Sequence, residues 1–387
     1  MLTESDETES ILKASVETFM RQESAMERLR QVKPGRPAHD RQVWGKLARQ
    51  GWLAMRLPEQ LGGSGLQARH AGAIAAVFGR FLLPEPFVGC ALLPAMLAAS
   101  ANRAAAWHDI LAALTDGDKV IAVAWQEDPQ SLDVCPVRTN AANGPAGLLI
   151  SGVKAGVVGA AMADDFLVTA RLEGQPVLVA VARSAPGVRV ETVTTSDGAS
   201  LGTVSLENAP AQGAVLFEGE ALLQALARAL DEALLAAAAQ LDGMAQAAFE
   251  IALDYMRTRE QFGQKIGSFQ SLQHAAVDLK VQHRLAAASY LSALQKLEAA
   301  GDVARHPAAV CAAISAAKAR ASDSALATAR FGVQVHGAIG FAMEADIGLY
   351  MKSALRASAW LGNGAQHRRR VSLLLQEQAS AARGADA

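Results

Sequence analysis

Cysteine is scarce in this chain of 387 residues, which contains Cys90, Cys135 and Cys311. The three lie far apart in the sequence, and no pair has the CxxC spacing of a zinc or redox site. A disulfide framework is therefore disfavoured, and each thiol is expected to act as a small buried hydrophobic group. This cysteine usage fits a reducing cytoplasm.

Net charge and long apolar runs are also lacking. The formal net charge is −2, which argues against binding to nucleic acid or to an anionic membrane surface. Apolar runs are interrupted by Arg, Asp or Gln before they reach a membrane-spanning length, so no membrane insertion is expected. The first residues, MLTESDETES, are polar and acidic and predict no signal peptide. These absences together favour a cytoplasmic protein.

The chain has ample material for buried cores. Hydrophobic residues make up 51% of it and charged residues 19%, over a length that predicts two or three domains. Helical periodicity in 1–117 changes to short β-prone runs in 118–218 and returns in 219–387. We therefore predict an α+β multidomain fold with an N-terminal helical domain, a central small β-barrel or sandwich, and a C-terminal four-helix bundle.

Periodicity and helix-breaking residues predict the individual elements. Pro58 and the glycines of GGSG enforce a loop in the first part. The predicted helices are Glu9–Gln22, Asp40–Gln50, further helices from about Gln67 through Thr115, Ala221–Arg259, Phe269–Ala300, Pro307 to about Val335 and two shorter pieces after Asp346. Seven or eight strands are predicted, and they include the runs Val120–Trp125, Leu148–Ile150, Phe166–Ala170, Val177–Val181, Val188–Val193 and Gly202–Leu206.

The most informative stretch is Tyr255–Asp278, YMRTREQFGQKIGSFQSLQHAAVD, which joins the long helix to the next one. Gly263 and Gly267 are expected to break the first helix, and Ser268 is predicted to be the N-cap of the second. Arginine side chains and free backbone N–H groups at such a corner suit a phosphate. Composition alone leaves a second interpretation open, which is a solvated basic helix end.

The spacing of this whole stretch closely resembles the C-terminal signature of the acyl-CoA dehydrogenases, and the resemblance spans nearly all of the chain. In that family the corner holds the FAD pyrophosphate of the neighbouring subunit. The resemblance implies that Arg259 contacts the pyrophosphate and that Gln261 and Phe262 line the cofactor. It also implies a helix–barrel–helix order, with FAD and oligomer contacts on the C-terminal bundle.

A second stretch, QVHGAIGFAMEADIGLYMK over Gln334–Lys352, resembles the family's Gln-x-x-Gly-Gly-x-Gly-Phe segment. The resemblance implies that Gln334 and Gly337 approach the adenosine-diphosphate half of FAD across a dimer interface. Glycine permits such a close approach of the backbone to a ligand. Ala338 replaces the second paired glycine, which is a departure from the family. Taken alone, Gln334 and His336 are polar loop residues.

The family's reaction needs a carboxylate general base that removes the α-proton of an acyl-CoA thioester while FAD accepts the β-hydride. Of the two family positions for this base, one falls on Leu361, before Gly362, and the other on Ala233. Neither side chain accepts a proton. Glu232 is a candidate if the alignment slips by one residue, although one residue turns a helical side chain by about 100°. The alternative is that Asp231 and Glu232 are solvated charges near a helix start.

The resemblance also marks the place of the flavin ring, where the family carries Thr-Glu-Pro…Gly-Ser-Asp and, further along the chain, Trp-x-Thr. Here the first region reads WQEDPQSLD over Trp125–Asp133. Gly156 and Val158 occupy the positions where the tryptophan and threonine are expected. The stacking ring and the hydroxyl are both missing. Trp125 is either a substitute for the ring or a core residue of the barrel.

These departures imply a division of roles. Residues for the chain's own flavin ring and substrate are missing, whereas those lent to a neighbour's FAD remain. The leading hypothesis is therefore a partner subunit, without its own base, of an α2β2 acyl-CoA dehydrogenase. The tail resembles the small subunit of pimeloyl-CoA and steroid-type enzymes, which suggests fatty acid or steroid catabolism. His367 and Arg368–Arg370 either contact a CoA phosphate or carboxylate, or form a solvated helix face.

The implied partners are a second acyl-CoA dehydrogenase-family subunit, an acyl-CoA substrate and electron-transfer flavoprotein. Two alternatives remain open. One is a self-sufficient FAD-dependent dehydrogenase with a displaced base at Glu232. The other is a non-catalytic binding or scaffold protein that uses the same fold.

Overall fold

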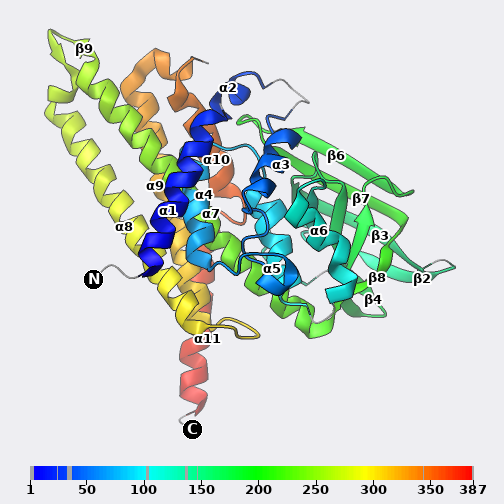
Figure 1. Ribbon diagram of the computed structural model, residues 1–387. Helices are drawn as coiled ribbons and strands as arrows, with labels where there is room; N and C mark the ends of the chain where they lie inside the picture. The colour runs from blue at the N-terminus through cyan, green and yellow to red at the C-terminus, as the bar shows by residue number, and fades with distance from the viewer. Residues whose placement is uncertain are drawn as a thin grey trace. The chain divides into compact units, whose positions relative to one another are not determined.

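The computed structural model describes residues 4–23, 25–32, 37–101, 104–135, 138–145, 147–342 and 344–385. Helices occupy the described chain as far as Asp116, strands run from Ile121 to Glu218, and helices return from Gly219 (Figure 1). This order confirms the predicted α+β fold. Contacts between residues divide the chain into two compact units. The helical unit comprises Met1–Gln31, Ala68–Leu83 and Leu234–Ala387, and the sheet unit comprises Val32–Gln67 and Pro84–Ala233.

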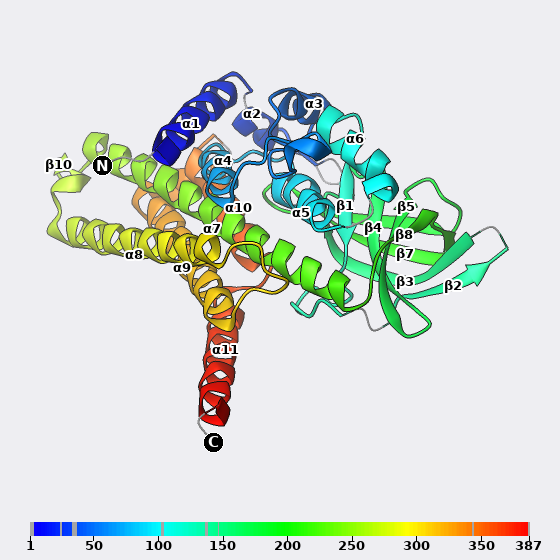
Figure 2. The same ribbon diagram turned by 60° about the horizontal axis from the view of Figure 1, so that its bottom comes forward.

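The strands of the sheet unit are β1 (Ile121–Ala124), β2 (Asn140–Gly144), β3 (Gly147–Val158), β4 (Asp165–Leu172), β5 (Gln175–Ala182), β6 (Val188–Thr194), β7 (Ser200–Pro210) and β8 (Gln212–Glu218). They form one sheet in the order β6-β7-β3-β2-β4-β5-β8, and β1 pairs in parallel with β4 (Figure 2). β2 and β8 lie outside the runs that were located from the sequence. The run NAANG of β2 has no β-branched residue, so its pairing with β3 defines it as a strand.

The sheet unit also contains α3 (Arg41–Arg49), η1 (Glu59–Leu61), the π-helical η2 (Val88–Leu92), α5 (Leu93–Ala99), η3 (Ala104–Trp107), α6 (His108–Asp116) and the first part of α7 (Gly219–Thr258). α3 confirms a predicted helix. It begins after Asp40, whose carboxylate accepts a hydrogen bond from the Gln42 N–H. It ends before Gly51, whose φ of 75° is left-handed and stops the helix.

The helical unit contains α1 (Glu4–Gln22), α2 (Ala25–Arg30), α4 (Ala68–Arg80), the second part of α7, α8 (Gln270–Ala300), α9 (Ala308–His336), η5 (Gly337–Phe341), α10 (Asp346–Ala359) and α11 (Gly364–Ala385). α8 and α9 run side by side in both views (Figures 1 and 2). Small residues permit close helix packing, since a Cβ on Gly79 or Gly243 would lie 1.9 Å from a backbone carbonyl oxygen of the facing helix. Among the described residues, no helix combines the length and the apolar character needed to span a membrane.

Between α7 and α8 the chain forms a hairpin in which β9 (Glu260–Gln261) pairs with β10 (Gln264–Lys265), followed by η4 (Ile266–Ser268). Phe262 and Gly263 have φ values of 53° and 80°, as a two-residue type I′ turn requires. The prediction that Ser268 is the N-cap of α8 is wrong. Phe269 occupies that position without a side-chain cap, and Ser268 Oγ donates to the Lys265 carbonyl. The Ser268 hydroxyl therefore forms its hydrogen bond at the η4 turn and does not cap α8.

Candidate functional site

The hairpin corner after α7 is held against that helix by its own backbone. The Arg259 N–H donates to the Tyr255 carbonyl at 2.8 Å, and the Ile266 N–H donates to the Arg259 carbonyl at 2.9 Å. A Cβ on Gly267 would lie 2.8 Å from the Met256 carbonyl oxygen. Glycine is therefore needed where the chain returns to α7, and the corner is an ordered platform at the end of the helix.

Phe262 presents an aromatic ring on this platform. Its side chain is 91% exposed, and its positive φ costs a non-glycine residue about 1–2 kcal/mol. Strain of this kind clusters at ligand sites. The Phe262 ring meets the Phe269 ring edge-to-face, with centroids 6.1 Å apart, and the neighbouring Gln261 is exposed as well. The exposed ring is suited to contact a planar ligand.

The cations at the corner differ in whether they are paired. Arg257 donates to Asp254 at 2.8 Å. Lys265 lies 2.8 Å from Glu260, and its hydrogen bond and charge lower the pKa of that carboxyl. Arg259 is exposed, and within the described part of the chain its guanidinium makes no hydrogen bond or ion pair. The Arg259 guanidinium is therefore the group at this corner that can receive an anion without breaking an existing pair.

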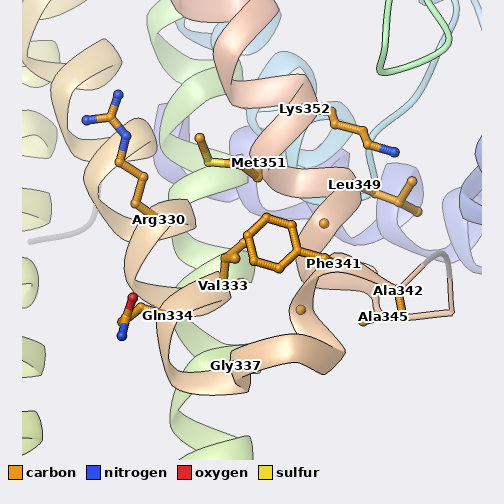
Figure 3. Close-up of a pocket in the computed structure, with 12 residues that line it drawn as sticks. Arg330, Val333, Gln334, Gly337, Phe341, Ala342, Ala345, Leu349, Met351 and Lys352 are labelled. Carbon is orange, nitrogen blue, oxygen red and sulfur yellow. The ribbon is translucent and has the colours of Figure 1, made fainter.

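A cavity of about 520 Å³ lies in the helical unit at the C-terminal end of α9. In Figure 3, Arg330, Val333 and Gln334 come from α9, Phe341 from η5, and Leu349, Met351 and Lys352 from α10. Most of the lining side chains are apolar, and Arg330 and Lys352 add two cations. The lining residues are Arg330, Val333, Gln334, Gly337, Gly340, Phe341, Ala342, Ala345, Gly348, Leu349, Met351 and Lys352. The predicted cofactor residues Gln334 and Gly337 are among them.

The two small residues after α9 have different requirements. Gly337 has φ 62° and ψ −139°, a conformation that is essentially restricted to glycine. A Cβ at Gly337 would meet no atom within 4 Å, so the requirement comes from the backbone and the space beside it is open. Ala338 is exposed and has no positive φ. Alanine at this position therefore causes no backbone strain, which explains how the departure from the paired glycines is tolerated.

A ring stack brings the two predicted cofactor segments together. The Tyr255 ring, near the end of α7, stacks on the His336 ring, at the end of α9, with centroids 3.9 Å apart and an angle of 22° between the planes. Tyr255 precedes Arg259 by one helical turn, and His336 directly precedes Gly337. Residues far apart in the sequence are thus neighbours at one end of the helical unit.

The chemistry of this end fits the adenosine-diphosphate half of FAD. Exposed guanidinium groups on Arg259 and Arg330 suit phosphates. Apolar walls and exposed rings at Phe262 and Phe341 suit a purine. The open space at Gly337 permits a ligand to approach the backbone. When bound, FAD supplies hydride acceptance, and these residues of the chain would hold its nucleotide half.

The two positions at which the resemblance predicts a base contain buried apolar residues. Leu361 is 3% exposed and lies between α10 and α11, and Ala233 is buried within α7. Asp231 and Glu232 are buried too, well inside a helix that begins at Gly219. The interpretation of these two carboxylates as solvated charges near a helix start is therefore wrong, because the helix packs that face into the sheet unit's core.

Glu232 is held by an arginine that the sequence did not point to. Arg56 Nη2 lies 2.7 Å from one carboxylate oxygen and Arg56 Nε lies 2.9 Å from the other. The Arg56 side chain is 17% exposed and the Glu232 side chain is 10% exposed. A bidentate guanidinium stabilises the carboxylate and covers both of its oxygens. This geometry opposes a role for Glu232 as a proton acceptor.

The positions at which the resemblance predicts contacts to the flavin ring also lack the expected groups. Gly156 and Val158 lie on β3, and a Cβ on Gly156 would contact Pro129 at 3.4 Å. Trp125 is buried, and its carbonyl accepts hydrogen bonds from Lys154 Nζ and Thr169 Oγ1. The structure therefore supports the core interpretation of Trp125 and provides no stacking ring from that side chain.

A buried ion pair near β1 was not predicted. Lys154 Nζ lies 3.1 Å from Glu127 and 3.1 Å from Thr169 Oγ1. Burial lowers the pKa of Lys154 to about 8, although Glu127 opposes this shift. Burial alone would raise the pKa of Glu127, but hydrogen bonds from Thr139 and Arg138 and the Lys154 charge lower it to about 2. The pair anchors the segment after β1 to β3 and β4.

In the C-terminal tail, the structure places His367 differently from both interpretations that the sequence left open. His367 is 0% exposed, and its Nε2 lies 2.8 Å from the Leu361 carbonyl oxygen, so neither a CoA contact nor a solvated face describes it. Arg368 pairs with Asp323 at 2.6 Å.

Close by, the fully buried Lys318 donates to the carbonyls of Ala357, Ser358 and Gly362. Burial lowers the pKa of Lys318 to about 7.

Comparisons with known proteins identify the family. The acyl-CoA dehydrogenase N-terminal domain model matches residues 6–105, and the acyl-CoA dehydrogenase C-terminal domain model matches residues 223–373. The chain belongs to the acyl-CoA dehydrogenase family. Enzymes of this family are FAD-dependent oxidoreductases, so the predicted family, fold and cofactor are confirmed.

Two relatives come from Mycobacterium tuberculosis. The acyl-CoA dehydrogenase IpdE2 is 26% identical over 349 residues, covering 90% of this chain and 91% of its own, and FadE27 is 27% identical over 343 residues, covering 87% and 89%. Among solved structures, a variant of the steroid acyl-CoA dehydrogenase Tcur3481-Tcur3483 has a TM-score of 0.83 and 26% identity, covering 97% of this chain and 99% of that one. The ChsE4-ChsE5 complex from M. tuberculosis, at 23% identity, has the same TM-score and shares the fold.

Proposed function

We propose that this chain is the partner subunit of a heteromeric, FAD-dependent acyl-CoA dehydrogenase. In this assembly, an α2β2 heterotetramer, the chain completes the FAD site of a second family subunit. That second subunit supplies the general base and the contacts to the flavin ring. The residues contributed by this chain are Arg259, Gln261, Phe262, Gln334, Gly337 and Ala338.

The observation that supports this proposal is that the Arg259 guanidinium is unpaired, whereas the Glu232 carboxylate is paired. The Arg259 guanidinium is exposed and makes no hydrogen bond or ion pair in the described chain, so it can bind a phosphate at little cost. The Glu232 carboxylate is held on both oxygens by Arg56. Leu361 and Ala233 have no ionisable group. The chain therefore resembles a contributor to a cofactor site more than the owner of a proton-abstracting site.

The relatives support a heteromeric assembly and a substrate class. One similar structure is described as a steroid acyl-CoA dehydrogenase with two named components, and another as a complex of two chains. By analogy, we propose that the assembly catalyses the α,β-dehydrogenation of an acyl-CoA from steroid or fatty acid catabolism. Its proposed electron acceptor is electron-transfer flavoprotein, and its proposed location is the cytoplasm. The division into 1–117, 118–218 and 219–387, with FAD and the oligomer interface on the last part, belongs to this proposal.

The runner-up is a self-sufficient dehydrogenase that uses Glu232 as a displaced base. It would require Arg56 to release the carboxylate, or a substrate to enter between them, at each turnover. Breaking a buried bidentate pair costs several kcal/mol, since an unpaired buried charge remains. The same geometry favours a structural role for Glu232.

Co-purification tests the proposal directly. The chain is expressed alone and together with a second acyl-CoA dehydrogenase-family chain from the same genome, and flavin per chain and native mass are measured. The two chains together are expected to form a heterotetramer with fewer FAD molecules than chains. This chain expressed alone is expected to retain little flavin. A homotetramer with one FAD per chain and full activity would overturn the proposal. A colourless heteromer would favour the binding or scaffold alternative.

A further inference from the structure

We propose that Tyr255 and His336 form a positioning pair that holds the hairpin corner and the end of α9 at the separation needed to bind one nucleotide. This inference rests on the proposed function, because it concerns how the contributed residues are kept together. Neither side chain is assigned a direct contact with the cofactor. Their role is to set the place of residues that do contact it.

The Tyr255 side of the pair is coupled to the corner through its backbone. The Tyr255 carbonyl accepts the Arg259 N–H at 2.8 Å and the Thr258 hydroxyl at 3.2 Å. These bonds form the turn that presents Arg259. A shift of the Tyr255 ring therefore moves the start of the corner and, with it, the Arg259 guanidinium.

The His336 side is coupled to the end of α9. His336 Nδ1 lies 2.7 Å from the Gly332 carbonyl oxygen, and a carbonyl oxygen accepts, so Nδ1 carries the proton and the ring orientation is defined. His336 directly precedes Gly337, whose glycine-specific conformation turns the chain into η5. The stacked rings, 3.9 Å apart, therefore connect the two turns that lead to the predicted cofactor residues.

The pair is suited to positioning more than to stabilising the core. Both rings are half-buried, at the exposed end of the helical unit. Binding sites lose affinity when their groups are displaced by as little as about 0.5–1 Å. A contact that adds little to overall stability can therefore still matter for a ligand that is held from both helices.

The test uses the heteromeric complex and a matched control. Tyr255→Leu removes the stacking ring but keeps apolar bulk, whereas Tyr255→Phe and His336→Phe keep an aromatic pair. Phe249→Leu is the control, because Phe249 makes another ring contact in the same unit, with Lys280 Nζ 5.6 Å from its centroid. FAD is removed and titrated back by absorbance and fluorescence, and thermal unfolding is followed by circular dichroism.

Tyr255→Leu is expected to weaken FAD binding about 5- to 10-fold, which corresponds to the loss of one aromatic pair. Tyr255→Phe and His336→Phe should stay within about 2-fold of the wild type, since the stack is retained. Phe249→Leu should lower the unfolding temperature at least as much as Tyr255→Leu while leaving FAD affinity unchanged. Equal affinity in Tyr255→Leu and the wild type, or an equal loss in Phe249→Leu, would overturn the inference.

A measurement on the chain alone separates this inference from the proposed function. Spin labels on cysteines introduced at Gln261 and Ala338, with Cys135→Ser to remove a partly exposed thiol, report the separation of the corner and the end of α9. The distance distribution should broaden in Tyr255→Leu and stay narrow in Tyr255→Phe. An unchanged distribution rejects the positioning pair whatever the complex binds. A colourless wild-type complex rejects the proposed function, and with it the cofactor role of the pair.

Discussion

Glu232 lies within α7, and Arg259 directly follows the C-terminal end of the same helix. The two charged groups differ in burial and in pairing. Glu232 is buried in the sheet unit and held on both oxygens by Arg56. Arg259 is exposed just beyond the C-terminal end of α7 and, within the described residues, makes no side-chain hydrogen bond. A charge that is already paired in a core contributes to structure, whereas an unpaired charge at the surface can serve a ligand.

The largest effect is expected from breaking the buried pair. Glu232→Gln leaves the Arg56 guanidinium buried without its carboxylate, and the free energy of unfolding should fall by about 3 kcal/mol. Chemical denaturation measures this change, with the exposed Glu59→Gln as control. In the complex, the rate per bound flavin should stay close to that of the wild type. Loss of turnover in a folded, flavin-loaded variant would instead identify Glu232 as the base.

The next largest effect is expected from removing the unpaired guanidinium of Arg259. Arg259→Ala should weaken FAD binding to the complex about 10- to 100-fold, because a charge-assisted contact to phosphate is lost. Arg257→Ala is the matched control, since its guanidinium pairs with Asp254 at 2.8 Å, and it should change affinity little. Flavin titration of the reconstituted complex measures both. Similar losses in the two variants would mean that general positive charge matters more than the unpaired group.

The third effect contrasts the two buried lysines. Lys154 has a carboxylate partner, whereas Lys318 is surrounded by carbonyls and the Ser322 hydroxyl. Burial lowers the pKa of Lys318 from 10.5 to about 7, so between these values the unfolded chain binds a proton that the folded chain has lost. Stability should therefore rise with pH across this window.

Lys318→Met isolates this contribution. Relative to the variant, the wild type should gain about 2 kcal/mol in the free energy of unfolding between pH 7 and pH 9. Denaturation at both pH values measures the difference, and taking the difference from the variant removes the shared titration of other groups. A parallel pH profile for the two proteins would contradict a lowered pKa at Lys318.

The smallest effect is expected at the two residues after α9. Gly337→Ala forces alanine into φ 62° and ψ −139°, and should cost about 1–2 kcal/mol of stability together with some FAD affinity. Ala338→Gly restores the paired glycines of the family and should change stability by less than about 1 kcal/mol. Unfolding experiments on both variants test whether the glycine requirement resides at Gly337 alone.

Much of the architecture was predictable because it follows from local patterns. The bounds predicted for the helices after Arg259 differ from the observed ones by about one residue at most ends, since Pro307 and the glycines mark them. The strand β2 was missed because NAANG lacks a strand pattern and depends on its ladder with β3. Ser268 was assigned as a cap because the sequence pattern does not reveal that η4 intervenes.

The sequence by itself determined the family, the order of helices and strands, and the absence of an ionisable group at Leu361 and Ala233. It also identified Arg259 and Gln334 as cofactor candidates. The tertiary structure decided which charges are available. Arg56 and Glu232 lie 176 positions apart in the chain, and Tyr255 meets His336 through the packing of separate helices. Availability depends on the partners that folding brings near each group, and no local pattern encodes those partners.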